Sequence, residues 1–488
     1  MSDSTSDENT QKAQDSQKLD LKTKLAYGAG DLGPAITANI SIFYLLIFFT
    51  NVAGIDIGLA GGVLIVGKIW DAINDPFVGV LTDKTKSRRW GRRLPWMLYG
   101  AIPFGIFFFL QWIVPRFSSN QDSNVWGLLG YYVVIGVISQ TFYTVVNLPY
   151  TALTPELTQD YDERTSLNSF RFAFSIGGSI LSLLLARELF SRVPNQEQQY
   201  IVYVVLAAIC TVISVASLYW CVFGLRDRVL AFEAKRIQVE EPASIPFVEQ
   251  LKIAFSNRPF LFVIGIYLCS WLGVQITASI IPFFVLYCMS LTNSDVATVL
   301  LAVQATALLM LFVWTALSKK LGKKIVYFLG MILWIIAASA LYFLQPGQIG
   351  LMYLLAIMAG FGVSTAYLVP WSMIPDVIEL DELQTGQRRE GIFYSFMVFL
   401  QKLGLAFGLF LVSQALHTAG FQEVKPGQST PPIQPESALL AIRIVVGPLA
   451  VICLIFGLIL TYFYPITREM HAQILLQLQE RRQRRESQ

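Results

Sequence analysis

Two aspartates lie four residues apart in an apolar stretch of this 488-residue chain, within the run Lys68-Ile-Trp-Asp71-Ala-Ile-Asn74-Asp75-Pro76. In a helix, residues at this spacing project from one face, and Asn74 lies beside them. An ionised carboxylate at membrane depth is costly unless a partner or a cavity compensates its charge. The pair is therefore expected to share a cation, a proton or a basic side chain.

A purely structural interpretation of this pair is also available. Lys68 lies one turn before Asp71 and can form an ion pair with it. One lysine still leaves a second carboxylate without a counter-charge, and an uncompensated buried charge is strongly unfavourable. The sequence therefore favours a cation or proton site.

The composition indicates the class of protein. The chain is 54% hydrophobic and 14% charged, whereas a soluble protein carries roughly a quarter charged residues. A net charge of +3 is too small to indicate a nucleic-acid partner. The five cysteines show no metal-ligand spacing, and no P-loop, HExxH or Ser-His-Asp motif is recognisable, so we expect neither a metal centre built on cysteine nor an enzyme.

Apolar runs long enough to cross a bilayer, roughly 20 residues each, occur twelve times. They predict an all-α polytopic membrane protein with two six-helix bundles. The runs lie near 24–50, 58–83, 94–115, 124–152, 166–187, 200–224, 259–289, 295–318, 324–344, 349–376, 391–417 and 438–464.

Charge distribution suggests the domain organisation. Lysine and arginine concentrate in the even-numbered loops, which places those loops and both termini on the cytoplasmic side. The polar first residues lack the apolar core of a signal peptide and are expected to form a disordered tail. A cytoplasmic interfacial helix is expected over 474–485. The expected parts are a tail at 1–23, bundles at 24–224 and 259–465, a linker at 225–258, and a basic tail at 466–488.

The two halves of the chain resemble each other weakly. Span 4 ends in Pro155-Glu156, and span 10 ends in Pro375-Asp376. A match six spans apart is typical of transporters built from duplicated halves.

Several longer motifs carry a family resemblance. With the six-plus-six layout, they resemble the glycoside–pentoside–hexuronide:cation symporters, the melibiose-carrier family of the major facilitator superfamily, from residue 24 to 468. The motifs are Asp71-Ala-Ile-Asn74-Asp75-Pro76, Gly79-x-x-x-Asp83, Trp90-Gly91-Arg92-Arg93-Leu-Pro95-Trp96, Asn147-Leu-Pro149-Tyr150, Ile374-Pro375-Asp376 and Arg388-Arg389-Glu390-Gly391.

This resemblance implies a major facilitator fold and a secondary symporter that is coupled to Na⁺ or H⁺ and moves a sugar, glycoside or sugar acid by alternating access. It implies no cofactor besides the coupling cation, a monomer, and the inner membrane of a bacterial cell. The family's cation site maps onto Asp71, Asn74, Asp75 and Thr144. Hard cations prefer several oxygen ligands, which agrees with these residue types.

The resemblance also implies a substrate site. Arg171 and Lys402 match basic residues that the family places near its substrate, and Asn147, Thr151 and Trp371 are the further candidates. An arginine offers a planar fork of donors to hydroxyls, carboxylates or phosphates. Lys402 has a second possible role, which is to neutralise the helix-2 acids when the cation leaves.

Departures from the family pattern limit the substrate prediction. Ala35, Asn147 and Thr151 stand where the melibiose carrier has an Asp, a second Asp and a Trp, so galactoside binding in that mode is not expected. The stretch around Trp371 also resembles the family's lysophospholipid-carrying branch, so a lysophospholipid is the main alternative substrate. A non-transporting membrane sensor is a weaker alternative.

A set of charged residues at the cytoplasmic ends of the spans is expected to form a gate. In the superfamily such residues form charge pairs that close one face. The candidates are Asp83, Arg92, Arg93, Arg164 and Arg389.

Overall fold

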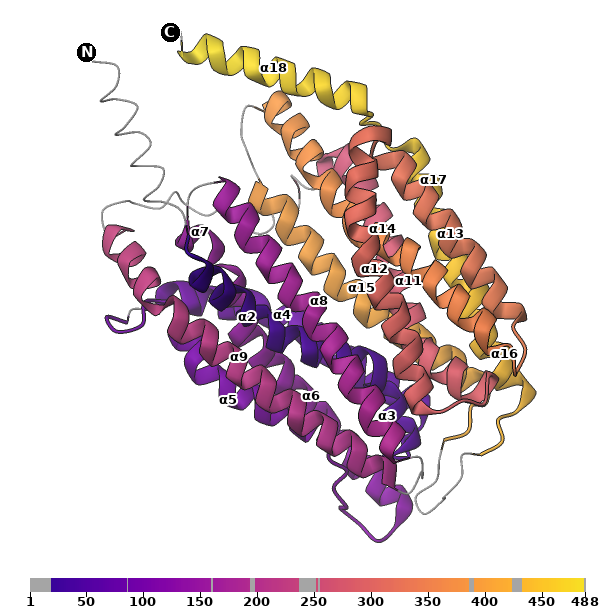
Figure 1. Ribbon diagram of the computed structural model, residues 1–488. Coiled ribbons are helices and arrows are strands. Elements are labelled where there is room, and N and C mark those ends of the chain that lie inside the picture. Colours follow the sequence, from indigo (N-terminus) through magenta and orange to yellow (C-terminus); the bar gives the residue numbers. More distant parts are fainter. Residues whose placement is uncertain are drawn as a thin grey trace. The chain divides into compact units, whose positions relative to one another are not determined.

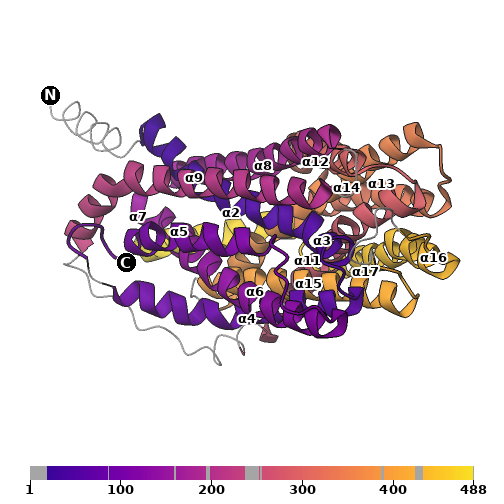
Figure 2. The same cartoon turned by 90° about the horizontal axis from the view of Figure 1, so that it is seen from below.

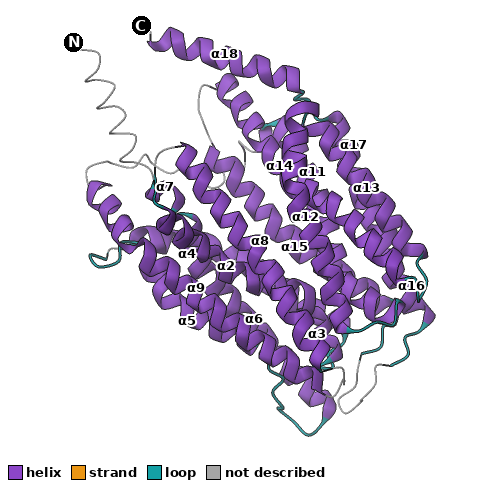
Figure 3. Ribbon diagram, viewed as in Figure 1, coloured by secondary structure: helices purple, strands orange, loops and turns teal. Residues whose placement is uncertain are grey.

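The computed structural model describes residues 19–85, 87–158, 161–193, 198–236, 252, 255–385, 390–423 and 432–486. Throughout these residues the regular structure is helical, without a strand (Figures 1 and 3). The prediction of an all-α polytopic chain is therefore confirmed. Eleven helical segments of the described part are long and apolar enough to cross a membrane, and the third predicted span is a shorter apolar helix, α5, at Leu94–Leu110.

The contacts divide the chain into two compact units. Unit 1 comprises residues 1–41, 73–185 and 198–241, and unit 2 comprises residues 42–72, 186–197 and 242–488. Helix α4 (Ile57–Lys84) therefore contributes its first part, with Asp71, to unit 2 and its second part, with Asp75, to unit 1.

Unit 1 is organised around α2 and α5. In two views α2 lies along α9, and α5 packs against both α6 and α9 (Figures 1 and 2). Its apolar core includes Tyr27, Phe104, Tyr150 and Leu167. The helices are α2 (Leu21–Ile40), α5, α6 (Gln121–Thr151), the short α7 (Thr154–Leu157), α8 (Tyr161–Arg192) and α9 (Gln199–Arg236).

Unit 2 is organised around α11 and α14. Helix α14 packs against α12 and α13, and α11 packs against α15 and α17. The elements are η1 (Ser41–Leu45), α3 (Leu46–Asn51), α11 (Arg258–Phe283), η3 (Phe284–Cys288), α12 (Asn293–Leu321), α13 (Lys323–Phe343), α14 (Ile349–Thr385), α15 (Glu390–Thr418), α16 (Glu436–Ile444), η4 (Val445–Leu449), α17 (Ala450–Phe463) and α18 (Arg468–Glu486).

Several boundaries differ from expectation, and helix α14 for example continues past the expected 376 to Thr385. Helix α9 continues to Arg236, so the first part of the region expected to be a linker is helical, and residues 237–251 lie outside the described part. The C-terminal tail forms α18, which begins at Arg468, earlier than the expected 474. Its polar residues bind unit 2 directly, because Arg481 donates to the Leu383 carbonyl of α14 (2.5 Å).

The weak repeat in the sequence has a structural counterpart. Gly91 precedes α5 with a φ of +71°, and Gly322 precedes α13 with a φ of +88°. This region of backbone conformation favours glycine. Each glycine is followed by basic residues that bind the carboxylate after a proline, Glu156 in one half and Asp376 in the other. The predicted internal duplication therefore shows in both turn geometry and charge pairing.

Close packing of α13 and α14 yields a stability prediction. A Cβ added at Gly362 would clash with the Trp334 side chain and lie 2.9 Å from the Gly330 carbonyl oxygen. Overpacking of this kind costs about 1–3 kcal/mol, so Gly362→Ala should lower the thermal unfolding midpoint in detergent. Gly350, on the same helix, has no neighbour within 4 Å, and Gly350→Ala is the matched control. Equal midpoints for the two variants would contradict this packing.

Candidate functional site

The second carboxylate of α4 lies against α6 inside unit 1. The Thr144 hydroxyl donates to Asp75 Oδ1 over 3.1 Å, and Thr144 itself is buried. Asn74 is also buried, and its Nδ2 has no hydrogen-bond partner among the described residues. The structure thus brings the Thr144 hydroxyl to the Asp75 carboxylate, and both are oxygen ligands of the kind that a hard cation prefers.

The first carboxylate of α4 is ion-paired inside unit 2. Lys402 Nζ, on α15, lies 3.1 Å from Asp71 Oδ2. Asp71 is almost fully buried at 1% exposure, and the Lys402 side chain is 18% exposed. The sequence left two roles open for Lys402. This geometry corresponds to the second, in which Lys402 neutralises an acid of the second span, here Asp71 of α4.

Arg171, on α8, pairs with a carboxylate that the sequence analysis did not single out. Its Nε lies 3.3 Å from Asp31 Oδ2 on α2, and Asp31 is 8% exposed. The guanidinium lies 5.7 Å from the centre of the Tyr150 ring. Asp31 is one turn before Ala35, where the sequence comparison with the melibiose carrier found no acid. A charged residue in a glycine-rich apolar span is a functional candidate by itself, and that signal was available in the sequence.

Two further substrate candidates lie on α6, one turn apart. Asn147 Oδ1 is buried and has no hydrogen-bond partner among the described residues, so it is an acceptor that a solute hydroxyl can satisfy. The Thr151 hydroxyl instead donates to the Leu148 carbonyl of its own helix (2.9 Å). The geometry is thus more favourable to Asn147 than to Thr151.

Trp371 belongs to an aromatic cluster in unit 2. Its ring stacks on Tyr394 with centroids 6.1 Å apart and meets Tyr267 edge to face at 6.0 Å. Trp271 continues the cluster between Tyr267 and Tyr367. Trp371 is partly exposed, so one ring of the cluster remains accessible for stacking.

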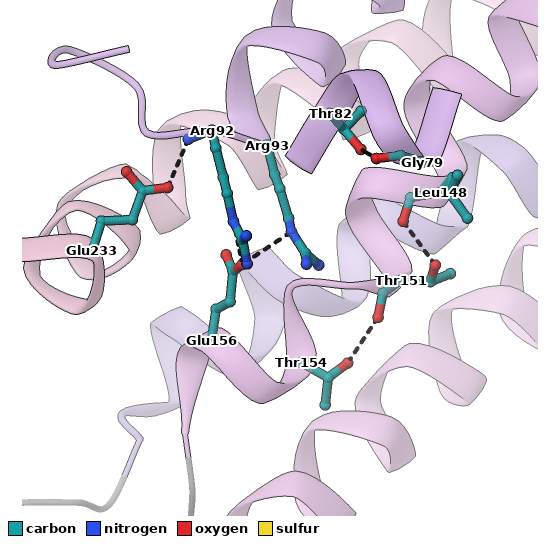
Figure 4. Close-up of polar contacts among 9 residues, drawn as sticks. All are labelled: Gly79, Thr82, Arg92, Arg93, Leu148, Thr151, Thr154, Glu156 and Glu233. Atoms are coloured by element: carbon teal, nitrogen blue, oxygen red, sulfur yellow. Dashed lines mark hydrogen bonds and ion pairs between the residues drawn. The ribbon is translucent and has the colours of Figure 1, made fainter. Parts of the chain in front are cut away.

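The gate arginines converge on a carboxylate that was not among the predicted gate residues. Arg92 Nη2 lies 2.5 Å and Arg93 Nε 2.9 Å from Glu156 Oε1 (Figure 4). Glu233 of α9 accepts the Arg92 backbone N–H (2.7 Å). Glu156 is 3% exposed, so the group is a partly buried charge cluster at the α4–α5 turn. Its counterpart in unit 2 joins Lys323 to Asp376 at 2.6 Å.

The remaining gate candidates are placed incompletely. The side chains of Asp83 and Arg164 and all of Arg389 lie outside the described residues. Glu163, the neighbour of Arg164 in the sequence, binds Lys24 Nζ at 3.0 Å and the Leu19 backbone N–H.

A second group of potential ligands lies where α14 meets α18. His471 Nε2 lies 2.6 Å from Glu379 Oε2 and 3.3 Å from Asp376 Oδ1. Three such residues are close enough to bind a metal ion. The Lys323 ammonium already contacts both Asp376 oxygens, at 2.6 and 2.8 Å. We therefore interpret the group as a hydrogen-bonded attachment of α18.

The Asp71–Lys402 pair predicts a specific pattern of stabilities. Asp71→Asn leaves a partly buried ammonium, and Lys402→Met leaves a buried carboxylate, so each should reduce the free energy of unfolding by about 1–3 kcal/mol. The double variant should lose less than the sum of the two. Chemical denaturation of the purified variants measures this coupling.

An exposed pair serves as the control for this cycle. Glu188 and Arg192 are ion-paired on α8 with side chains 61% and 72% exposed. Their coupling should be between zero and about 0.5 kcal/mol. Strictly additive effects at Asp71 and Lys402, like those at the exposed pair, would show that the buried pair makes no such contribution.

Comparisons with known proteins agree with this architecture. A family model described as "MFS/sugar transport protein" matches residues 26–468. An uncharacterized symporter of Synechocystis sp. is 51% identical, covering 96% of this chain and 98% of its own. Sodium-dependent lysophosphatidylcholine symporter 1-A of Danio rerio is 27% identical, covering 94% and 88%. The inner membrane symporter YicJ of Escherichia coli is also 27% identical, covering 96% and 97%.

Solved structures show the same fold at low sequence identity. The crystal structure of the nucleoside transporter NupG matches with a TM-score of 0.61 at 13% identity, covering 92% of this chain and 100% of its own. At this sequence identity, the structural similarity is evidence for the fold alone. Together with the family match, it confirms the predicted all-α polytopic fold of a major facilitator transporter.

Proposed function

We propose that the chain, which belongs to the MFS/sugar transport protein family, is a Na⁺-coupled symporter of a sugar or glycoside. It is an integral multi-pass membrane protein of a transporter family, not an enzyme. Its bacterial relatives include an inner membrane symporter, which supports a place in a bacterial inner membrane. The observation that carries the proposal is the Asp71–Lys402 ion pair on a helix whose next turn bears a second carboxylate.

The pair supplies a coupling mechanism. With no cation bound, the Lys402 ammonium neutralises Asp71. Na⁺ that binds the carboxylates of the single helix α4 competes with the ammonium for Asp71. Lys402 is then released and becomes available to a solute, which is the substrate role the sequence suggested for it. Cation binding and substrate binding favour each other because each stabilises the same released state.

The oxygen ligands favour Na⁺ over H⁺. A proton requires a single carboxylate, whereas the Thr144 hydroxyl of α6 also reaches Asp75 of α4, and Asn74 precedes Asp75 in the sequence. Neutral oxygens beside a carboxylate are suited to a small hard cation. Proton coupling remains the alternative outcome of the transport assay described below.

The substrate proposal rests on donors and acceptors in unit 1. Arg171 offers N–H donors, Asn147 Oδ1 is a buried acceptor without a partner in the described part of the chain, and Tyr150 lies beside Arg171. Hydroxyl groups both donate and accept hydrogen bonds, so a polyhydroxyl solute satisfies both kinds of group.

Transport alternates access between the two sides. The buried carboxylates give the reason for coupling, since a cavity that holds solute without its cation leaves charge unbalanced and resists closure. The clusters around Glu156 and Asp376 are the proposed cytoplasmic gate. Arg92 and Arg93, just before α5, bind Glu156 of α7, and Lys323, the first residue of α13, binds Asp376 of α14.

A lysophospholipid is the second candidate substrate. The observation that favours it is the similarity to a sodium-dependent lysophosphatidylcholine symporter over 94% of this chain. A sodium-coupled carrier of either substrate needs a cation site, so Asp71 and Asp75 do not separate the two substrates.

Uptake into proteoliposomes tests the function. We expect a panel of hexoses, pentoses and β-glycosides to contain a solute whose accumulation needs an inward Na⁺ gradient. Asp71→Asn and Asp75→Asn should each reduce Na⁺-driven accumulation at least tenfold, because each removes a cation ligand. Glu188→Gln, which alters an exposed carboxylate, should leave it unchanged.

Three results of this assay would contradict the proposal in different ways. Uptake that is driven by a pH gradient and does not depend on Na⁺ would show that H⁺, not Na⁺, is the coupling cation. Uptake of lysophosphatidylcholine but of no sugar would show that the substrate is a lysophospholipid. Unchanged Na⁺-driven uptake in both aspartate variants would remove the α4 carboxylates from the mechanism.

A further inference from the structure

Asp31 is a buried acid that neither the transport cycle nor the predicted cation site uses. It lies inside α2, with a side chain 11% exposed, and its charge is balanced by Arg171. No second ion pair of either residue is seen in the described part of the chain. Together they form an ion pair of zero net charge beside the proposed solute contact.

The pair is held in a rigid setting. Tyr150 donates its hydroxyl to the Tyr27 carbonyl (2.8 Å), and the two rings stack with centroids 5.1 Å apart. Tyr27 and Thr154 hydroxyls are 2.5 Å apart. A Cβ at Gly30 would clash with the Tyr150 ring, so α2 and α6 approach closely here. Asp31 is therefore fixed in place on one side of the guanidinium.

Arg171 keeps hydrogen-bonding capacity in this arrangement. It meets Asp31 through Nε, and its side chain remains 26% exposed. A guanidinium has five N–H donors, so donors remain after the contact with Asp31. Arg171 can thus donate to a solute, while the positive charge that would attract an anion is already balanced.

We propose that Asp31 sets the charge preference of the transporter, selecting uncharged polyhydroxyl solutes over sugar acids. This inference rests on the proposed role of Arg171 in solute binding. An acidic solute bound to Arg171 would bring a second carboxylate near Asp31. Like charges roughly 7 Å apart, in a site of effective dielectric constant about 20, lower the affinity for the acid by a factor on the order of tenfold or more relative to a site without Asp31. This repulsion offsets part of the attraction to Arg171, and the cost of desolvating the solute carboxylate then favours the neutral solute.

A structural strut is the alternative role for the pair. A strut would hold α2 against α8 without regard to solute charge. Its loss would weaken the binding of every solute by a similar factor. A charge-selecting role instead changes the ratio between a neutral sugar and the matching acid, so that ratio distinguishes the two roles.

The experiment measures this ratio with matched pairs of solutes, glucose with glucuronate and galactose with galacturonate. Binding to purified protein is followed by the ligand-induced shift in the unfolding midpoint, and transport by competition with the solute found in the uptake panel. In the unaltered protein we expect the neutral member to bind at least tenfold more tightly. Asp31→Asn should shift the ratio at least tenfold towards the acid, because it leaves the Arg171 charge unbalanced.

Three further variants serve as controls. Asp31→Glu keeps the charge and should keep the preference for the neutral sugar. Asp20→Asn, on the same helix, keeps an acceptor for the Thr23 N–H that Asp20 caps and should leave the ratio unchanged. If Asp31→Asn does not fold, the double variant Asp31→Asn with Arg171→Gln removes both charges and should retain the neutral preference with weaker binding.

The failures of this inference and of the proposed function are distinguishable. If sugars bind, but the ratio of affinities for the neutral sugar and the matching acid is the same in Asp31→Asn and in the unaltered protein, the role of Asp31 is overturned and the proposed function is not. Tighter binding of the acids by the unaltered protein would do the same. If neither member of any pair binds, the sugar proposal fails, and the inference fails with it.

Discussion

The requirement that every charge inside a membrane span be balanced governs this molecule. Helix α4 carries Asp71 and Asp75 in consecutive turns, and the two carboxylates have different partners. Asp71 is matched by the ammonium of Lys402, and Asp75 accepts a hydrogen bond from Thr144. The proposed coupling rests on the first of these contacts, because a cation that binds Asp71 must displace the Lys402 ammonium from it.

The same requirement explains the pairs outside this helix. Arg171 would be as costly as a lone carboxylate, and Asp31 balances it. At the ends of the spans, Glu156 receives two arginines and Asp376 receives Lys323. The repeated turn with a positive-φ glycine delivers the basic residues in both halves. Charge balance and internal duplication thus account for most of the polar contacts that position the proposed site.

Much of the fold could be predicted from the sequence, because span length and apolar composition are local properties. The helices overlap all twelve expected runs, although α9 and α14 extend past theirs, to Arg236 and Thr385, and α5 ends before its own, at Leu110. The choice of partners could not be predicted in the same way, since it depends on which helices pack together. Lys68 could be named from the sequence as a nearby ion-pair partner for Asp71. Lys402, which forms an ion pair with Asp71 in the structure, comes from a helix more than 300 residues further along the chain. Asp31 and Glu156 were visible in the sequence, but their roles emerged with α8 and the α4–α5 turn in place.

Competition between Na⁺ and the Lys402 ammonium for Asp71 is the central claim. The most direct measurement is the unfolding midpoint of the purified protein as Na⁺ replaces choline, in the unaltered chain, Lys402→Met and Asp71→Asn. Ligand binding raises the midpoint by mass action. The account predicts a rise in the unaltered protein, the same rise at Na⁺ concentrations at least tenfold lower in Lys402→Met, and none in Asp71→Asn. Superimposable Na⁺ curves for the unaltered protein and Lys402→Met would contradict it.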